Sequence, residues 1–178
     1  MIEPSIEKVL WFYGIYQPLY DEIPDVTFVE GFPCDYKSYI GGRTMFVIDD
    51  LTAECGNSKE LVKLYTKGSH HLNISVFTIS QNIFHRGADF REISLNRHYM
   101  FLFKFRRDVT QIAHLGRQLY PRKTKFFLEA FEDATKQPFG YLLVDLKSNT
   151  EENFRLRTSI LPGEMTCILG WIENSKCG

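Results

Sequence analysis

Six short apolar runs constrain the fold of this chain more than any other feature of its sequence. The runs are continuous rather than alternating, and they are rich in β-branched and aromatic residues. They cover Lys8–Tyr13, Val26–Gly31, Thr44–Asp50, Ile74–Gln81, His98–Phe105 and Tyr141–Leu146. Runs of this kind are typical of strands buried on both faces, and they therefore predict a parallel sheet covered by helices.

Three stretches with helical periodicity lie between these runs. One follows Ser58 and ends at Gly68. A second follows a capping box that begins at Asp108, and it ends before Pro121. The third is the apolar stripe of residues 126–134. The alternation of strands and helices predicts a three-layer α/β fold, and 178 residues, 44% of them apolar, are enough for one domain.

The apolar runs and the first residues bear on where the protein works. No run approaches the roughly 18 apolar residues of a membrane span. The acids Glu3 and Glu7 stand where a signal peptide would carry basic residues. We therefore expect an intracellular protein that is not secreted and has no membrane partner.

The predicted strand Thr44–Asp50 ends in two carboxylates, Asp49 and Asp50. Doubly wound α/β sheets bind ligands at the carboxyl ends of their strands. One carboxylate at that edge can hold Mg²⁺ while its neighbour polarises an attacking water, which is the arrangement of a Walker B element. The alternative interpretation is a strand that runs into an acidic turn, because such strings are common in α/β proteins.

Two amides, Gln81 and Asn82, come at the end of the next apolar run. Because the ends of adjacent parallel strands converge on one crevice, we expect Gln81 beside the Asp49–Asp50 pair. An amide in that position can orient the attacking water and sense the γ-phosphate. The alternative interpretation is a polar residue that begins a loop.

A series of strings, in order along the chain, carries a family resemblance. The strings are FYGIYQPLYDEI, VTFVEGFP, FVIDDL, YTKGSHHLNISVFTISQNIFH, REISLNRHYMFLFKFRRD, GRQLYP, EAFEDAT and FGYLLVD, and they cover nearly all of residues 8–162. With them the chain resembles the viral genome-packaging ATPases of the FtsK/HerA superfamily of P-loop NTPases. The likeness is to the poxvirus-like version found in Maverick/Polinton elements and related large DNA viruses, and it is clearest from the Walker B element onward, over residues 44–146.

The resemblance implies a RecA-like, three-layer P-loop fold with a mostly parallel sheet, and ATP and Mg²⁺ as cofactors. It implies that Asp49 binds Mg²⁺, that Asp50 activates water and that Gln81 is the polar sensor, with Asn82 contacting the nucleotide. Members of the family form ring-shaped, hexamer-like homo-oligomers that hydrolyse ATP to move double-stranded DNA into a capsid. The expected partners are therefore double-stranded DNA, the viral capsid and further copies of the chain. The expected location is the host nucleus, a cytoplasmic virus factory or the virion.

One motif of the family is missing from the sequence. A P-loop ATPase needs G-x-x-x-x-G-K-S/T, whose N–H groups and lysine hold the phosphates, and the nearest glycine pair, Gly41–Gly42, lacks both the spacing and the lysine. In the family that loop precedes the strand that residues 8–13 resemble, so we expect residues 1–178 to be an N-terminally truncated, partial P-loop ATPase domain. The chain is then a fragment of an ATPase. The alternative is a non-catalytic remnant or assembly module that binds DNA, capsid or an intact ATPase.

Basic residues are concentrated in one part of the chain. Residues 86–125 hold ten basic residues and three acidic ones, although the net charge of the whole chain is −1. An arginine donated across a subunit boundary is expected in such rings, and the candidates are Arg91, Arg97 and then Arg107. Contacts with DNA phosphates are expected from Arg107, Arg122, Lys123 and Lys125. For each of these residues the alternative is a solvated surface position.

Overall fold

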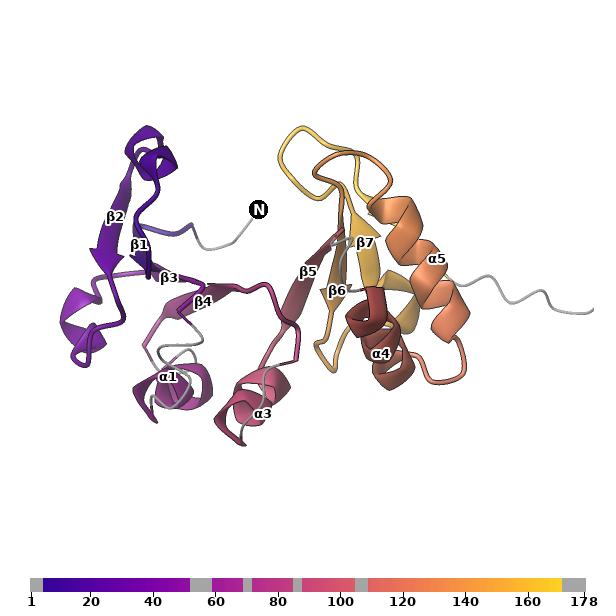
Figure 1. Cartoon of the computed structure of the whole chain (residues 1–178), viewed down its shortest axis with the longest axis horizontal. Helices are drawn as coiled ribbons and strands as arrows, with labels where there is room; N and C mark the ends of the chain where they lie inside the picture. The colour runs from indigo at the N-terminus through magenta and orange to yellow at the C-terminus, as the bar shows by residue number, and fades with distance from the viewer. Residues whose placement is uncertain (1–4, 52–58, 69–71, 85–87, 105–108, 171–178) are drawn as a thin grey trace, which may run out of the picture. The chain divides into compact units, whose positions relative to one another are not determined.

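A computed structural model describes the chain except for residues 1–4, 52–58, 69–71, 85–87, 105–108 and 171–178 (Figure 1). The chain is an α/β protein that divides into two compact units, unit 1 (Met1–Asn96) and unit 2 (Arg97–Gly178). Each unit has its own four-stranded sheet. The single domain expected over residues 1–178 stays a prediction.

The sheet of unit 1 is entirely parallel, with the strand order β2-β1-β3-β4. Its strands are β1 (Lys8–Tyr13), β2 (Val26–Glu30), β3 (Thr44–Asp49) and β4 (Ile74–Ile79). The first four apolar runs are therefore confirmed as strands of one parallel sheet. The central position of β3 is what matters for function, because the residues at its end are flanked by the ends of β1 and β4.

One face of this sheet carries the hydrophobic core of unit 1. The core contains Phe12, Phe46 and Ile48 from the strands, together with Leu64 and Ile93 from the helical segments that cover them. Those segments are α1 (Lys59–Lys63), the π-helical turn η3 (Leu64–Gly68) and α3 (Ala88–Leu95), and two 3-10 turns, η1 (Pro18–Glu22) and η2 (Tyr36–Tyr39), lie between the strands in sequence. Figure 1 shows α1 and α3 on the same side of the sheet. The predicted layer of helices on the other face of the sheet stays a prediction.

Unit 2 contains an antiparallel sheet with the strand order β5-β6-β7-β8. Its elements are β5 (Tyr99–Phe103), α4 (Val109–Leu119), α5 (Thr124–Ala134), β6 (Tyr141–Asp145), η4 (Glu152–Phe154), β7 (Leu156–Thr158) and β8 (Cys167–Ile168). The expectation that the fifth and sixth apolar runs join the parallel sheet is therefore wrong. Every residue of β6 is buried. A continuous apolar run indicates that a strand is buried, but it does not indicate whether the strand is parallel or antiparallel to its neighbours.

Helices α4 and α5 confirm the two helical stretches predicted on either side of Pro121. They pack closely: a Cβ placed on Gly116 of α4 would lie 2.7 Å from Cδ1 of Phe127 on α5.

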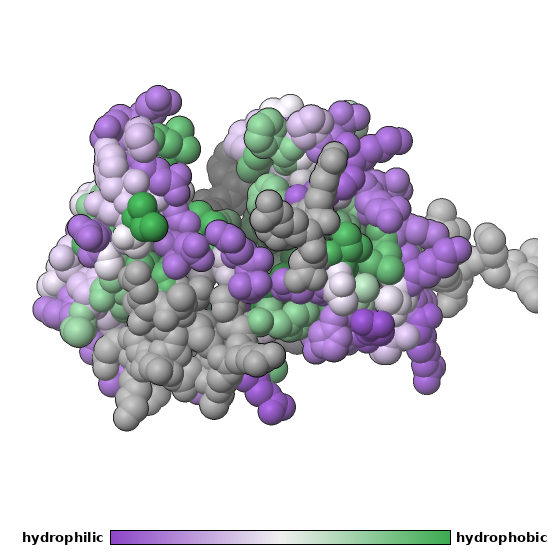
Figure 2. All heavy atoms as spheres, in the orientation of Figure 1, coloured by the Kyte–Doolittle hydropathy of each residue, from purple (hydrophilic) through white to green (hydrophobic). Residues whose placement is uncertain are grey.

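Hydrophobic residues reach the surface in both units among mostly hydrophilic side chains (Figure 2). Every helix in the described ranges is too short or too polar to cross a membrane.

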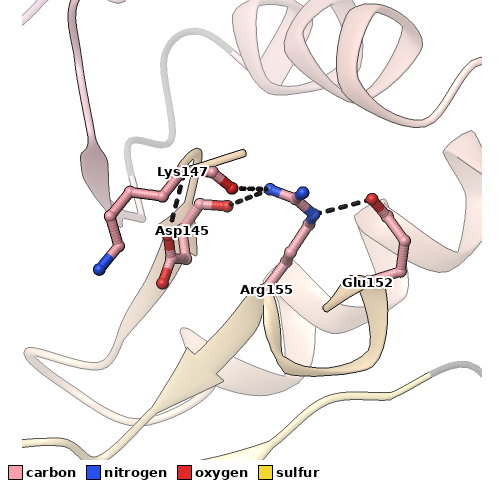
Figure 3. Close-up of polar contacts among 4 residues, drawn as sticks. All are labelled: Asp145, Lys147, Glu152 and Arg155. Atoms are coloured by element: carbon pink, nitrogen blue, oxygen red, sulfur yellow. Dashed lines mark hydrogen bonds and ion pairs between the residues drawn. The ribbon is translucent and has the colours of Figure 1, made fainter. Parts of the chain in front are cut away.

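A polar network closes the connection from β6 to β7 (Figure 3). Arg155 Nη1 donates to the carbonyl oxygens of Asp145 (3.1 Å) and Lys147 (2.9 Å), and its Nε donates to Glu152 Oε1 at 2.8 Å. The buried carboxylate of Asp145 accepts from Lys147 N at 3.1 Å and from Arg157 Nη2 at 2.6 Å. Both oxygens of Asp145 are therefore used within the fold.

The close approach of α4 and α5 gives a test of unit 2. We expect Gly116→Ala to destabilise the protein by about 1–3 kcal/mol, because a Cβ cannot fit against Phe127 unless the helices move apart. This loss opposes the gain of about 1 kcal/mol in helix propensity. Thr110→Ala is the matched control, since Thr110 is exposed on the same helix. Urea unfolding of the two variants checks the prediction, and equal or greater stability of Gly116→Ala would contradict the packing described here.

Candidate functional site

Asp49 is the last residue of β3, and it lies between Tyr13 of β1 and Ile79 of β4 in the parallel register. Its carboxylate is half-buried. Trp11 Nε1 donates a hydrogen bond to Asp49 Oδ2 at 3.2 Å, and the Tyr20 hydroxyl donates to the same oxygen at 3.0 Å. The carboxylate is therefore held in one orientation at the carboxyl edge of the sheet.

Strand geometry explains why Trp11 reaches Asp49. Side chains alternate between the two faces of a strand, so Trp11 and Tyr13 of β1 share the face of Asp49. Tyr20 comes from η1 and stacks on Phe28 of β2, with ring centroids 4.6 Å apart. Trp11, Tyr13, Tyr20 and Phe28 form an aromatic cluster that covers this face beside the carboxylate.

The Tyr20 hydroxyl is a permanent hydrogen-bond donor in the physiological pH range. Burial and, after it, the hydrogen bond to the negatively charged Asp49 together raise the pKa of Tyr20 to about 12. Only 4% of Tyr20 is exposed. The phenol therefore stays protonated and continues to donate to Asp49 wherever that carboxylate is ionised.

Asp50 follows β3 in the left-handed region, with φ of +51°. Aspartate tolerates this conformation better than most residues, because its short polar side chain can hydrogen-bond locally. The Asp50 N–H donates to the Ile79 carbonyl at 3.2 Å, which continues the pairing of β3 with β4. Beyond the end of β4, Gln81 Nε2 donates to Asp50 Oδ2 at 3.4 Å. The predicted position of Gln81 beside the paired carboxylates is confirmed.

Asn82 takes part in the turn that follows β4. Its N–H donates to Ser80 Oγ at 3.3 Å, and Ser80 Oγ donates to the Asn82 carbonyl at 3.0 Å. Gln81 and Asn82 are both exposed. The turn therefore brings Gln81 back toward Asp50, and the predicted contact between Asn82 and a nucleotide stays a prediction.

The predicted basic site residues occupy other parts of the chain. Arg91 is exposed on α3 in unit 1, and Arg97 is the first residue of unit 2. The remaining candidates in unit 2 are Arg122, Lys123 and Lys125, of which Lys125 pairs with Glu129 at 3.6 Å on α5. Arg107 lies outside the described residues. Of the predicted site residues that are described, Asp49, Asp50 and Gln81 are those that the strand ends bring together.

The Gly41–Gly42 turn lies at the opposite end of β3 from Asp49, because it immediately precedes the strand. Thr44 Oγ1 donates to the Gly41 carbonyl at 2.9 Å, and Thr44 is fully buried. The guanidinium of Arg43 pairs with Glu7 at 2.5 Å. These residues are engaged in the turn itself, so they do not fit the phosphates of ATP at the Asp49 edge.

The carboxylate oxygens at the carboxyl edge fit a magnesium ion whose remaining ligands are water and phosphate oxygens. Both hydrogen bonds to Asp49 go to Oδ2, so Oδ1 accepts none from the described part of the chain. No group of three or more His, Cys, Asp or Glu side chains among the described residues could hold a metal by itself. Mg²⁺ usually needs only one or two carboxylates in addition to substrate phosphates.

Sequence reasoning did not find Trp11 and Tyr20 as residues of this edge. Alternation along β1 is the one signal that could have found Trp11, because it places this residue on the face of Asp49 once the register is known. Tyr20 comes from a 3-10 turn between two strands. No local pattern connects that turn to the end of β3.

A comparison with protein-family models, curated proteins and solved structures finds no match to this chain. The likeness to packaging ATPases therefore stays a prediction from the sequence. What the structure adds is the parallel sheet and the juxtaposition of Asp49, Asp50 and Gln81 at its carboxyl edge.

The bond between Tyr20 and Asp49 can be tested by titration. A raised pKa means that Tyr20 stabilises the fold fully below about pH 10 and loses that contribution as the pH rises toward 12. The absorbance of ionised tyrosine, wild type minus Tyr20→Phe, should show one group that titrates near pH 12.

In Asp49→Asn the same group should titrate at lower pH, because the charged acceptor is gone. Asp25→Asn is the matched control, since Asp25 is an exposed aspartate and asparagine tolerates its positive φ of 59°. An unchanged titration in Asp49→Asn would show that the two side chains do not interact.

Proposed function

We propose that this chain provides the magnesium-binding and water-activating part of a DNA-translocating ATPase of the genome-packaging kind. The observation that carries the proposal is the hydrogen bond of 3.4 Å between Gln81 and Asp50 across two adjacent strand ends. A Walker B pair needs its carboxylates at the carboxyl edge of a parallel sheet, with a polar group from the neighbouring strand beside them. The order of motifs along the sequence supports the same family.

Each residue at the edge has a chemical role that its environment suits. Asp49 is held by Trp11 and Tyr20 with Oδ1 left over, so Asp49 is the residue that would hold Mg²⁺. When bound, that ion supplies positive charge against the phosphate oxygens. Asp50 is exposed and can accept a proton from water. Gln81 donates a hydrogen bond to the Asp50 carboxylate and can orient the water.

ATP itself does not fit residues 1–178. The sequence contains no G-x-x-x-x-G-K-S/T, and the Gly41–Gly42 turn lies at the other end of β3. Turnover therefore needs a phosphate-binding loop that these residues do not contain. We expect the chain by itself to hydrolyse no ATP.

The missing phosphate loop also favours a second candidate function. A non-catalytic assembly module that binds DNA, capsid or an intact ATPase needs no such loop. The two candidates differ in what they require of the Asp49 edge: the motor part needs its carboxylates for Mg²⁺, whereas an assembly module needs them only for the fold. Two exposed basic residues near the start of α5, Arg122 and Lys125, suit contact with DNA phosphates in both cases.

Double-stranded DNA binding by the purified chain tests the translocation proposal. We expect affinity to fall with salt, and we expect Arg122→Gln to reduce the salt slope by about 0.9 for the loss of one phosphate contact. Lys37→Gln is the matched control, because Lys37 is exposed in η2 of unit 1. An absence of salt-dependent binding would contradict a role in moving DNA.

Phosphate release in the same mixture, with Mg²⁺ and ATP added, provides the second readout. The expected rate is that of buffer for the wild type and for Asp50→Asn, because the sequence contains no G-x-x-x-x-G-K-S/T loop to hold the phosphates. Asparagine tolerates the left-handed backbone at position 50, so the variant should fold normally. Hydrolysis by the wild type that Asp50→Asn abolishes would contradict the need for a further loop.

A further inference from the structure

Unit 2 contains a cavity of about 460 Å³ at the end of β5. It is lined by Phe103, the last residue of β5, by Lys104, which follows that strand, and by residues 135–140, which connect α5 to β6. Small-molecule sites in proteins have volumes of roughly 300–1,000 Å³, so this cavity has room for one nucleotide-sized group.

The turn that forms this cavity is tightly built. The buried Thr135 donates from Oγ1 to the Phe131 carbonyl at 2.7 Å, and the Gly140 N–H donates to the Gln137 carbonyl at 3.0 Å. A Cβ on Gly140 would lie 2.5 Å from the Ala134 carbonyl oxygen, so only glycine fits there. The turn therefore holds the residue before Gly140 in a fixed place.

That residue is Phe139, and both its backbone conformation and its exposure to solvent are unusual. Its φ is +62°, a left-handed conformation that is uncommon for a bulky side chain and costs of order 1 kcal/mol. The side chain is 95% exposed, so the phenyl ring gains almost nothing from burial. Strained backbone of this kind concentrates at functional sites. Phe139 therefore offers an open aromatic surface at a cost to the fold.

The charged side chains among the lining residues are both lysines, which favours an anionic ligand. Lys104 and Lys136 are both exposed and both line the cavity, and no carboxylate is among the lining residues. Among the described residues neither lysine has an ion-pair partner. An open aromatic ring and two lysines that line one cavity form a combination suited to single-stranded nucleic acids, in which bases stack on rings and phosphates contact basic side chains.

We propose that this cavity binds an unpaired nucleotide of a single-stranded nucleic acid. The base stacks on Phe139, and Lys104 and Lys136 contact the adjoining phosphates. A duplex cannot bind in this way, because its base faces are already stacked within the helix. The site belongs wholly to unit 2 and does not require the Asp49 edge to be active.

Fluorescence anisotropy of the full chain with a labelled oligothymidylate of about ten nucleotides tests the stacking contact. We expect Phe139→Leu to weaken binding about 5- to 100-fold, because one stacked base is lost. Phe139→Trp should bind at least as tightly as the wild type, since tryptophan keeps an aromatic face at this position. Phe154→Leu, at an exposed phenylalanine in η4 of unit 2, should leave binding unchanged.

The lysines are tested through salt dependence. Lys104→Gln and Lys136→Gln should each reduce the salt slope for the oligothymidylate by about 0.7, the value for one phosphate contact on a single strand. Lys37→Gln should leave that slope unchanged. Because Phe139, Lys104 and Lys136 are exposed, these variants should keep the circular dichroism spectrum and thermal midpoint of the wild type.

Two results would overturn the proposal. One is unchanged oligothymidylate affinity in Phe139→Leu, which would show that no base stacks on the ring. The other is an equal loss of affinity for a duplex of the same length, which would show that the ring does not select unpaired bases. The DNA-translocation proposal has a separate readout, because it predicts that Arg122→Gln lowers the salt slope of duplex binding whether or not Phe139 contributes.

Discussion

The parallel pairing of β3 between β1 and β4 is the constraint on which the candidate site depends. A parallel register directs all three strands the same way, so their carboxyl ends meet at one edge. Burial of Phe46 and Ile48 against the covering helices fixes that register, because a slip of one residue would move both to the other face. The meeting of Asp49 and Gln81 at one edge is thus a consequence of hydrophobic packing at the centre of the sheet.

The carboxylates of Asp145 and Asp49 have different kinds of hydrogen-bond partner. Asp145 in unit 2 is buried, and its two oxygens are used by Arg157 and by the Lys147 N–H, so it joins β6 to β7. Asp49 is half-buried, and within the described part of the chain it accepts two hydrogen bonds on one oxygen, both from the neutral donors Trp11 and Tyr20. A carboxylate that is oriented but still charged is suited to bind a cation, whereas a neutralised one holds the fold together.

Sequence patterns predicted those parts of the structure that depend on local periodicity and burial. The strands of unit 1, the helices α4 and α5, and the meeting of Gln81 with the Asp49–Asp50 pair all follow from such patterns. The direction of β5 and β6 could not be predicted from their apolar runs. The fully buried antiparallel strand β6 is as continuously apolar as a buried parallel one, and the apolar run of β5 includes exposed residues at both ends of the strand. The bond from Tyr20 to Asp49 joins a short turn to a distant strand end, and only the assembled sheet brings them together.

The most direct measurement of the cation site uses the indole N–H of Trp11, which lies 3.2 Å from Asp49 Oδ2. Mn²⁺ takes the same hard oxygen ligands as Mg²⁺ and broadens the NMR signals of nearby protons. If Asp49 holds a divalent cation, Mn²⁺ should broaden the Trp11 indole signal selectively in the wild-type chain and in Asp25→Asn, and Asp49→Asn should abolish the effect. A Trp11 signal that stays sharp while other signals broaden, or that broadens equally in Asp49→Asn, would contradict a cation site at this edge.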